Sequence, residues 1–295
     1  SLFRARNSLE INLINKLKDK IMDKLIMYIP ILLLISSVTT GLLSKRLSNV
    51  HAGIISSSLV FISLILSLFV CFNIFSEESN ILYDDFYQWI SIDSLSIGMG
   101  FLIDKLSAMM TVVVLLISFL VHVYSIGYMR DEKDFKRFFS YIGLFTFSMI
   151  LLVISNNLIQ LFIGWEGVGL VSYLLIGFFY KKESAIKANL KAFLINRIGD
   201  MFFIIGIIMV FTLLDSFDYK TIFLNLEAFD IDKLDYIYGF SYLDIACFFL
   251  FIGAMAKSAQ IPLHVWLPDS MEGPTPISAL IHAATMVTAG TVSYT

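Results

Sequence analysis

Several ionisable side chains lie within or beside long apolar stretches of the sequence, and their types suit the transfer of protons. They are Glu166, Arg197, Asp200, Lys257, His264 and His282. A charge at the centre of a bilayer costs several kcal/mol unless it is paired or hydrated, so such residues usually have a function. The default interpretation of this set is therefore a path for protons or other ions.

Glu166 stands nine residues into the apolar stretch 157–180, which is roughly 13 Å along a helix. Gly164, Gly167 and Gly169 surround it and allow a neighbouring helix to approach closely. Burial and a nearby cation act in opposite directions on a carboxyl, so such a group can be tuned to exchange protons near neutral pH. The structural alternative is a carboxyl that is permanently protonated or ion-paired for packing.

Lys257 stands near the end of the stretch 243–260, five residues before Pro262. Because proline breaks a helix interior, we expect a discontinuous helix whose last turns carry this lysine. Discontinuous helices at mid-membrane are where transporters place ion sites, so Lys257 is a candidate for loading and releasing a proton. The alternative is a lysine that extends to the membrane surface.

Two histidines follow this break in the chain. His282 lies about seven residues into a segment that opens with Pro274, Thr275 and Pro276, which is favourable chemistry for a helix start. Its side chain titrates closest to neutral pH and suits a proton relay, although a lone histidine in a helix is more often a hydrogen-bonded core residue. His264 is the weaker candidate, in irregular backbone that needs a watery lining.

Arg197 and Asp200 share one helix face because they are three residues apart. This spacing predicts that the two side chains pair directly, which lowers the cost of burying both. A purely structural pair and a modulatory role in the ion path are equally compatible with the pattern.

The elements that must position these residues follow from the composition. Hydrophobic residues make up 58% of the 295 positions and charged residues only 15%, against about 25% charged in soluble proteins. Blocks of about 20 apolar residues can each span a bilayer, and only helices satisfy their backbone within the segment. Eight blocks fit: 26–43, 52–75, 106–126, 138–154, 157–180, 188–214, 243–260 and 275–291. The predicted fold class is an all-α polytopic membrane protein with about eight transmembrane helices.

The basic residues sort by side of the membrane. Loops 44–51, 127–137 and 180–187 hold nine lysines and arginines, whereas loops 76–105 and 215–242 hold three. The positive-inside rule places the first group on the cytoplasmic or matrix side. Residues 26–295 are expected to form one membrane domain, and residues 1–25 a basic amphipathic extension on the membrane surface.

Composition also excludes several functions. The net charge of −3 gives the chain no nucleic-acid character. Its two cysteines, Cys71 and Cys247, are too few for an iron–sulfur cluster or a four-cysteine zinc site.

Several motifs resemble NADH–ubiquinone oxidoreductase chain 5, an antiporter-like, proton-pumping membrane subunit of respiratory complex I. Residues 164–177 read GWEGVGLVSYLLIG, and residues 196–200 read NRIGD. The longest match, over residues 253–290, is GAMAKSAQIPLHVWLPDSMEGPTPISALIHAATMVTAG. The resemblance covers most of residues 90–291.

The resemblance implies a role for each candidate residue. It places a membrane glutamate at Glu166, a pumping lysine at Lys257 and a relay histidine at His282. Asp200, Arg197 and His264 become plausible members of the same proton path. The implied fold is antiporter-like with a discontinuous seventh helix, and the second half of the family fold is missing from this chain.

The resemblance also implies the molecular setting. No cofactor or metal is expected on this chain, because NADH, FMN, iron–sulfur clusters and ubiquinone belong to other subunits of the complex. The expected partners are lipids and other membrane subunits of complex I, including a chain that carries the missing C-terminal half. Prominent Phe, Ile, Asn, Lys and Tyr, read by AT-rich codons, suggest an organelle-encoded gene and the mitochondrial inner membrane.

Two other functions are carried as alternatives. The first is the large subunit of a multi-subunit sodium/proton antiporter, in which a lysine would stand at the position of Thr288. The second is a purely structural half of a split pump subunit.

Overall fold

Six long helices form most of the computed structural model, which describes residues 2–76, 81–92, 95–228, 236–237, 240–283 and 286–292. They are α1 (Leu2–Leu42), α2 (Asn49–Ser76), α3 (Lys105–Tyr128), α4 (Phe135–Val153), α5 (Leu158–Ile176) and α6 (Glu183–Leu214). Among the described residues, each of these helices contains a stretch long and apolar enough to cross a membrane. The first six predicted spans are therefore confirmed as helices.

The seventh predicted segment is interrupted. The helix α8 (Tyr242–Lys257) ends at Lys257, so the predicted discontinuity before Pro262 is present. Turns and the short helix η3 (Asp269–Glu272) follow, and then α9 (Thr275–Ala283) and α10 (Met286–Val292) occupy the eighth segment. With 16 residues, α8 is shorter than the usual span of about 20 residues.

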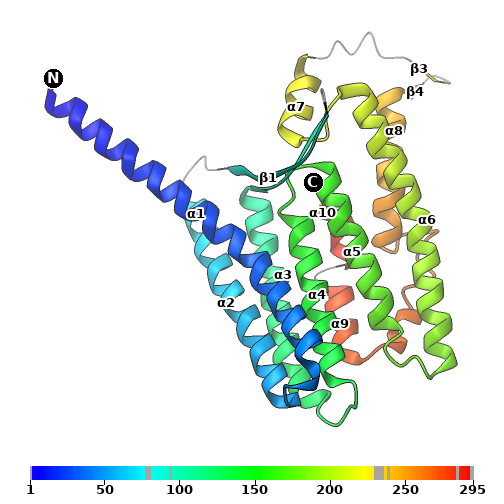
Figure 1. Ribbon diagram of the computed structural model, residues 1–295. Helices are drawn as coiled ribbons and strands as arrows, with labels where there is room; N and C mark the ends of the chain where they lie inside the picture. The colour runs from blue at the N-terminus through cyan, green and yellow to red at the C-terminus, as the bar shows by residue number, and fades with distance from the viewer. Residues whose placement is uncertain are drawn as a thin grey trace.

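The helices form two groups that share α5 as a border (Figure 1). The helices α1 to α4 pack into one bundle, α5 packs against α4, and α6 pairs with α8 beyond α5. The helix α10 contacts α4, α5 and α8, so it lies between the two groups. This arrangement brings α5, α6 and α8, which carry most of the candidate residues, next to one another.

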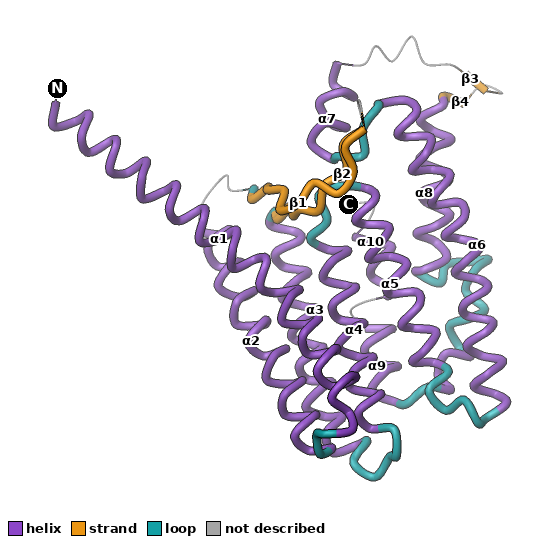
Figure 2. The backbone as a smooth tube through the Cα atoms, viewed as in Figure 1, coloured by secondary structure: helices purple, strands orange, loops and turns teal. Residues whose placement is uncertain are grey.

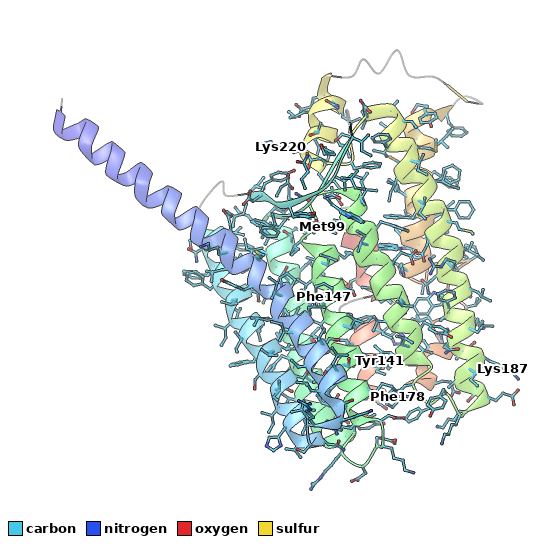
Figure 3. The ribbon with its side chains drawn as sticks, in the orientation of Figure 1. Met99, Tyr141, Phe147, Phe178, Lys187 and Lys220 are labelled. Atoms are coloured by element: carbon cyan, nitrogen blue, oxygen red, sulfur yellow. The ribbon has the colours of Figure 1, made fainter. Side chains whose placement is uncertain are left out.

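The two ends of the molecule differ as the charge pattern predicts. The connections from α1 to α2, from α3 to α4 and from α5 to α6 lie at one end, and the strands and α7 (Tyr219–Ala228) lie at the other (Figure 2). Lys187 and Lys220 mark these opposite ends in Figure 3. The predicted extension 1–25 is the beginning of α1, which projects away from the bundle before it continues into the span that begins at Met22 (Figure 1).

The acidic segment 76–105 contains structure that the all-α prediction lacks. Two antiparallel strands, β1 (Leu82–Ile92) and β2 (Leu95–Ile103), form a hairpin in which Leu82 pairs with Ile103. A second, two-residue pair joins β3 (Tyr236–Ile237) and β4 (Phe240–Ser241). The membrane-spanning helices agree with the all-α prediction. The segment 76–105 contains strands that this prediction did not include.

The hairpin is bonded to the start of α5. The backbone N–H of Gly100 donates to Gln160 Oε1, and Gln160 Nε2 donates back to the Gly100 carbonyl, each at 2.9 Å. Asn157 caps α5 by accepting from the Gln160 N–H at 2.7 Å, and its Nδ2 donates to the Gly98 carbonyl at 2.9 Å. These bonds fix the end of the helix that carries Glu166.

Small residues let the helices around α5 and α6 approach closely. A Cβ at Gly164 would lie 2.7 Å from the backbone nitrogen of Leu152 on α4, and a Cβ at Gly199 would overlap the methyl group of Ala256 on α8. The glycine-rich sequence around Glu166 therefore packs as predicted, with a neighbouring backbone against it.

Candidate proton-transfer site

Four ionisable side chains from three adjacent helices gather beside one another. Glu166 lies on α5, Arg197 and Asp200 lie on α6, and Lys257 is the last residue of α8. Since α6 packs against both α5 and α8, its two charged side chains can reach partners on either neighbour. The structure thus brings together four of the six residues predicted from sequence.

Lys257 is buried against Asp200. The Lys257 Nζ lies 3.9 Å from Asp200 Oδ1, and the two side chains are only 1% and 5% exposed. The ammonium has no hydrogen-bond partner of its own among the described residues. Gly169 leaves the space that Nζ occupies, because a Cβ there would lie 2.5 Å from it. The Lys257 side chain is thus enclosed by the neighbouring helices.

Trp165 links α5 to this pair. Its Nε1 donates to Asp200 Oδ1 at 2.7 Å, and its ring lies 5.6 Å from Lys257 Nζ. The indole also stacks on Phe203 with centroids 4.6 Å apart and planes 3° from parallel. Trp165 directly precedes Glu166 in the sequence, but its bond to Asp200 could not be read from spacing because the two residues are on different helices.

Arg197 bonds Glu166, not the neighbour predicted from sequence. Its Nη1 donates to Glu166 Oε2 at 2.7 Å, with the side chains 41% and 24% exposed. The predicted pairing of Arg197 with Asp200 is therefore wrong. Both residues point from α6 toward other helices, and α5 offers each of them a partner. The second Glu166 oxygen, Oε1, is buried without a hydrogen-bond partner among the described residues.

His282 lies on α9, half-buried, apart from the four charges. Its Nε2 is 2.8 Å from Ser270 Oγ, and its Nδ1 is 3.2 Å from Ser278 Oγ. Sequence reasoning did not select either serine. Ser278 could have been found, because it precedes His282 by four residues and so shares its helix face. Ser270 lies in η3, and only the fold brings it to His282.

His264 is exposed in the turns that follow α8, and its backbone carbonyl accepts from Leu267 at 3.1 Å. Lys191 is tied to Asp269 by a 2.7 Å ion pair. His122 is fully buried in α3 with Nδ1 2.7 Å from the Ser118 carbonyl. These residues lie outside the four-charge group.

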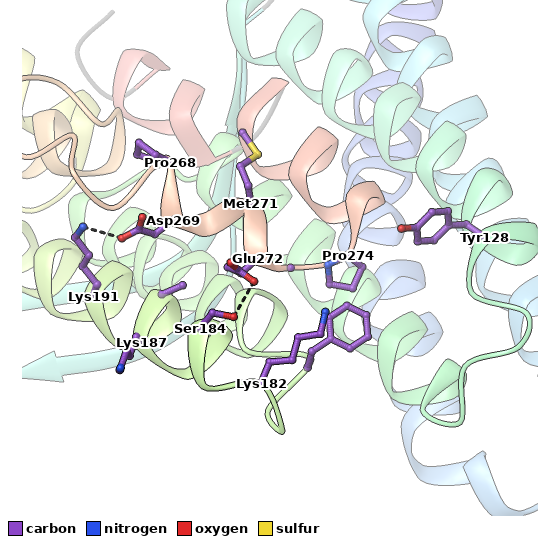
Figure 4. Close-up of a pocket in the computed structure, with 13 residues that line it drawn as sticks. Tyr128, Lys182, Ser184, Lys187, Lys191, Pro268, Asp269, Met271, Glu272 and Pro274 are labelled. Atoms are coloured by element: carbon purple, nitrogen blue, oxygen red, sulfur yellow. Dashed lines mark hydrogen bonds and ion pairs between the residues drawn. The ribbon is translucent and has the colours of Figure 1, made fainter.

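A polar cavity of about 630 Å³ opens between the start of α6 and η3 (Figure 4). Two bonds cross it: Lys191 to Asp269, and Ser184 Oγ to Glu272 Oε2 at 3.0 Å. Tyr128 and Met271 also line it. It lies at the basic end of the molecule, one residue away from Ser270, which contacts His282.

Comparison with known proteins assigns a family to this fold. Residues 89–139 match the family described as NADH-ubiquinone oxidoreductase (complex I), chain 5 N-terminus. Residues 155–295 match the family described as NADH:quinone oxidoreductase/Mrp antiporter, transmembrane part.

Individual proteins similar to this chain carry names from the same family. NADH-quinone oxidoreductase subunit L of Neisseria meningitidis serogroup A is 50% identical over 275 residues, covering 91% of this chain and 41% of that protein. NADH-ubiquinone oxidoreductase chain 5 of Marchantia polymorpha is 44% identical over 267 residues, covering 89% and 40%. The chain thus spans about two fifths of the length of these curated relatives.

Two solved structures share the fold. The Mrp complex from Dietzia has a TM-score of 0.75 at 22% identity, covering 90% of this chain and 27% of the matched one. An archaeal membrane-bound sulfane sulfur reductase has a TM-score of 0.77 at 16% identity, covering 91% and 52%.

The fold and the buried charges define an antiporter-like, multi-pass membrane protein. Within that class, the chain belongs to the family of complex I chain 5 and subunit L.

Proposed function

We propose that this chain translocates protons as a membrane subunit of an NADH:quinone oxidoreductase. The observation that carries the proposal is the placement of the Lys257 ammonium, 1% exposed, against Asp200 and beside the Glu166–Arg197 pair. A buried cation with a carboxylate near it and no hydrogen bond of its own is a group whose protonation can be changed by moving a neighbouring charge.

The proposed mechanism is a redistribution of these charges, driven by redox chemistry in other subunits. When a carboxylate approaches Lys257, the protonated amine is stabilised, and when it withdraws, the proton leaves toward His282. Arg197 holds Glu166 in the observed arrangement, so release of that bond is the step that frees Glu166 to act on Lys257.

The energy required is modest. Moving one charge against 100 mV takes about 2.3 kcal/mol, and a tenfold change in proton affinity is worth about 1.4 kcal/mol. A hundredfold change at Lys257 therefore covers the step. One carboxylate that moves by a few ångströms in a low-dielectric setting supplies an interaction of this size.

The test is Lys257→Met in the assembled complex, in sealed membrane vesicles. Proton uptake driven by NADH is measured together with quinone reduction. We expect the variant to lose proton uptake per quinone reduced. The matched control is Lys45→Met, which removes an exposed lysine in the connection between α1 and α2 and should leave that ratio unchanged. Normal uptake in both Lys257→Met and Glu166→Gln would contradict the proposal.

Sodium/proton antiport is the second candidate, because the fold is shared with the Mrp complex from Dietzia. The greater sequence identity to complex I relatives favours the first. Proton flux that depends on sodium and proceeds without NADH would reverse this choice.

We further propose the setting of the complex. NADH, FMN, iron–sulfur clusters and ubiquinone would belong to other subunits, and the location would be the mitochondrial inner membrane. Purification of the complex followed by mass spectrometry of its subunits tests this setting, since a complex without the other subunits of an NADH:quinone oxidoreductase would contradict it.

A further inference from the structure

Each ring nitrogen of His282 meets a serine hydroxyl, and each hydroxyl has a second acceptor. Ser270 Oγ lies 2.8 Å from Nε2 and donates to the Leu267 carbonyl at 2.6 Å. Ser278 Oγ lies 3.2 Å from Nδ1 and 2.7 Å from Met271 Sδ. A hydroxyl has one proton to donate, so these alternatives determine where the protons of the imidazole lie.

The protonation of His282 Nε2 is fixed by its surroundings. Because the Ser270 hydroxyl donates to the Leu267 carbonyl, it can only accept from His282, and Nε2 must carry a proton. In the neutral imidazole Nδ1 then has a free lone pair, which accepts from the Ser278 hydroxyl.

The protonation of His282 Nδ1 can change. When Nδ1 also carries a proton, it donates to Ser278 Oγ, and the Ser278 hydroxyl turns to Met271 Sδ, which is a weak acceptor already in contact. Rotation of this one hydroxyl satisfies the site in both protonation states, with no movement of the imidazole ring.

We propose that His282 takes up and releases its proton at Nδ1 and that the Ser278 hydroxyl transfers the proton to Nδ1. In the uptake step the Ser278 O–H bond breaks, an N–H bond forms at Nδ1, and Oγ takes a proton from a protonated water in the cavity. Met271 lines that cavity (Figure 4), whereas Ser270 is 2% exposed. Ser278 is thus a relay partner and Ser270 a positioning residue. The inference rests on the proposed proton pump.

The test compares three variants in the assembled complex: Ser278→Ala, Ser278→Thr and Ser270→Ala. The measurements are NADH-driven proton uptake per quinone reduced and its rate ratio between H₂O and D₂O. We expect Ser278→Ala to lower uptake about fivefold, from the loss of one hydrogen bond, and to change the isotope ratio. The threonine variant keeps a hydroxyl and should restore both. Ser270→Ala should lower uptake only about twofold.

Two outcomes would overturn the inference. Unchanged uptake and isotope ratio in Ser278→Ala would remove Ser278 from the relay, and a larger loss in Ser270→Ala than in Ser278→Ala would place the exchange at Nε2. Lys257→Met separates this result from the proposed function: if that variant stops uptake while the serine variants do not, only the serine assignment fails. The quinone reduction rate reports whether each variant assembles.

Discussion

The bundle of α1 to α4 and the group of α5, α6 and α8 bury polar side chains in opposite ways. In the bundle the buried polar groups are mostly hydroxyls. They bond helix carbonyls, as Ser125 does to the Val121 carbonyl at 2.6 Å, or one another, as Ser118 does to Thr146 at 2.6 Å. In the second group they include charges, and Lys257 Nζ and Glu166 Oε1 have no hydrogen bond among the described residues. Buried atoms without a hydrogen bond among the described residues occur in both regions, but those of the bundle include the hydroxyls of Ser57 and Thr111, whereas those of the second group include a carboxylate oxygen and an ammonium.

The largest effect is expected from removal of one partner of the buried pair. Asp200→Leu leaves Lys257 without a carboxylate and Trp165 without an acceptor, and isolating a buried charge costs about 3–5 kcal/mol. Ser118→Ala in the bundle should cost only about 1 kcal/mol. Thermal unfolding of the detergent-solubilised complex measures both.

The control for this pair is Asp200→Asn, which keeps an acceptor for Trp165 and removes only the charge. Its loss should fall between those of the other two variants. Equal losses for Asp200→Leu and Ser118→Ala would mean that the two regions do not differ in how they bury polar groups.

The two tryptophans give a finer comparison. Trp165→Phe removes a bond to a carboxylate, which is worth about 1.5–3 kcal/mol. Trp266→Phe removes a 3.1 Å bond to the Ala256 carbonyl, a neutral acceptor worth about 0.5–1.5 kcal/mol. Both indoles are fully buried, so the difference in thermal stability reports the charge on the acceptor. A greater loss for Trp266→Phe would mean that the bond of Trp165 to a carboxyl side chain is no stronger than a bond to a backbone carbonyl.

A third test concerns the space around the ammonium. Gly169→Ala places a methyl group 2.5 Å from the position of Lys257 Nζ and should cost about 1–3 kcal/mol by overpacking, together with a loss of proton uptake. Gly127→Ala is the matched control in the bundle helix α3, because a Cβ there meets nothing within 4 Å. The control should be neutral or slightly stabilising. If uptake in Gly169→Ala equals that of the control, Lys257 does not depend on this space.

The sequence predicts the spans, the interruption after Lys257 and the set of buried charges, because each depends on local hydropathy or on proline chemistry. It does not predict the partners. Arg197 and Asp200 are three residues apart and look like a pair, but the partner of each is decided by the packing of α5 on α6 and by the approach of α8 to α6 at Gly199. The hairpin was missed for a related reason, since its bonds to Asn157 and Gln160 join segments far apart in sequence.

The smallest effect is expected outside both regions, at the hairpin. Burial and a hydrogen bond to the Asp218 carboxylate raise the pKa of Tyr83 above its usual value of 10. The folded state therefore favours the neutral phenol. This contribution is complete below pH 10 and is lost as the pH rises beyond that value, where the unfolded chain ionises first.

Tyr83→Phe should cost about 1 kcal/mol at neutral pH, and its deficit relative to the unmodified chain should shrink above pH 10. Thermal unfolding of both proteins between pH 8 and about pH 11 measures the difference, over a range that brackets the unfolded value. Asp218→Asn should abolish part of the same pH dependence, because it keeps the acceptor and removes the charge. A deficit that stays constant across this range would mean that Asp218 and the burial of the phenol do not perturb Tyr83. The loss of stability in Tyr83→Phe, at a partly buried hydrogen bond, is thus the reference for the larger loss expected at the buried Lys257–Asp200 pair.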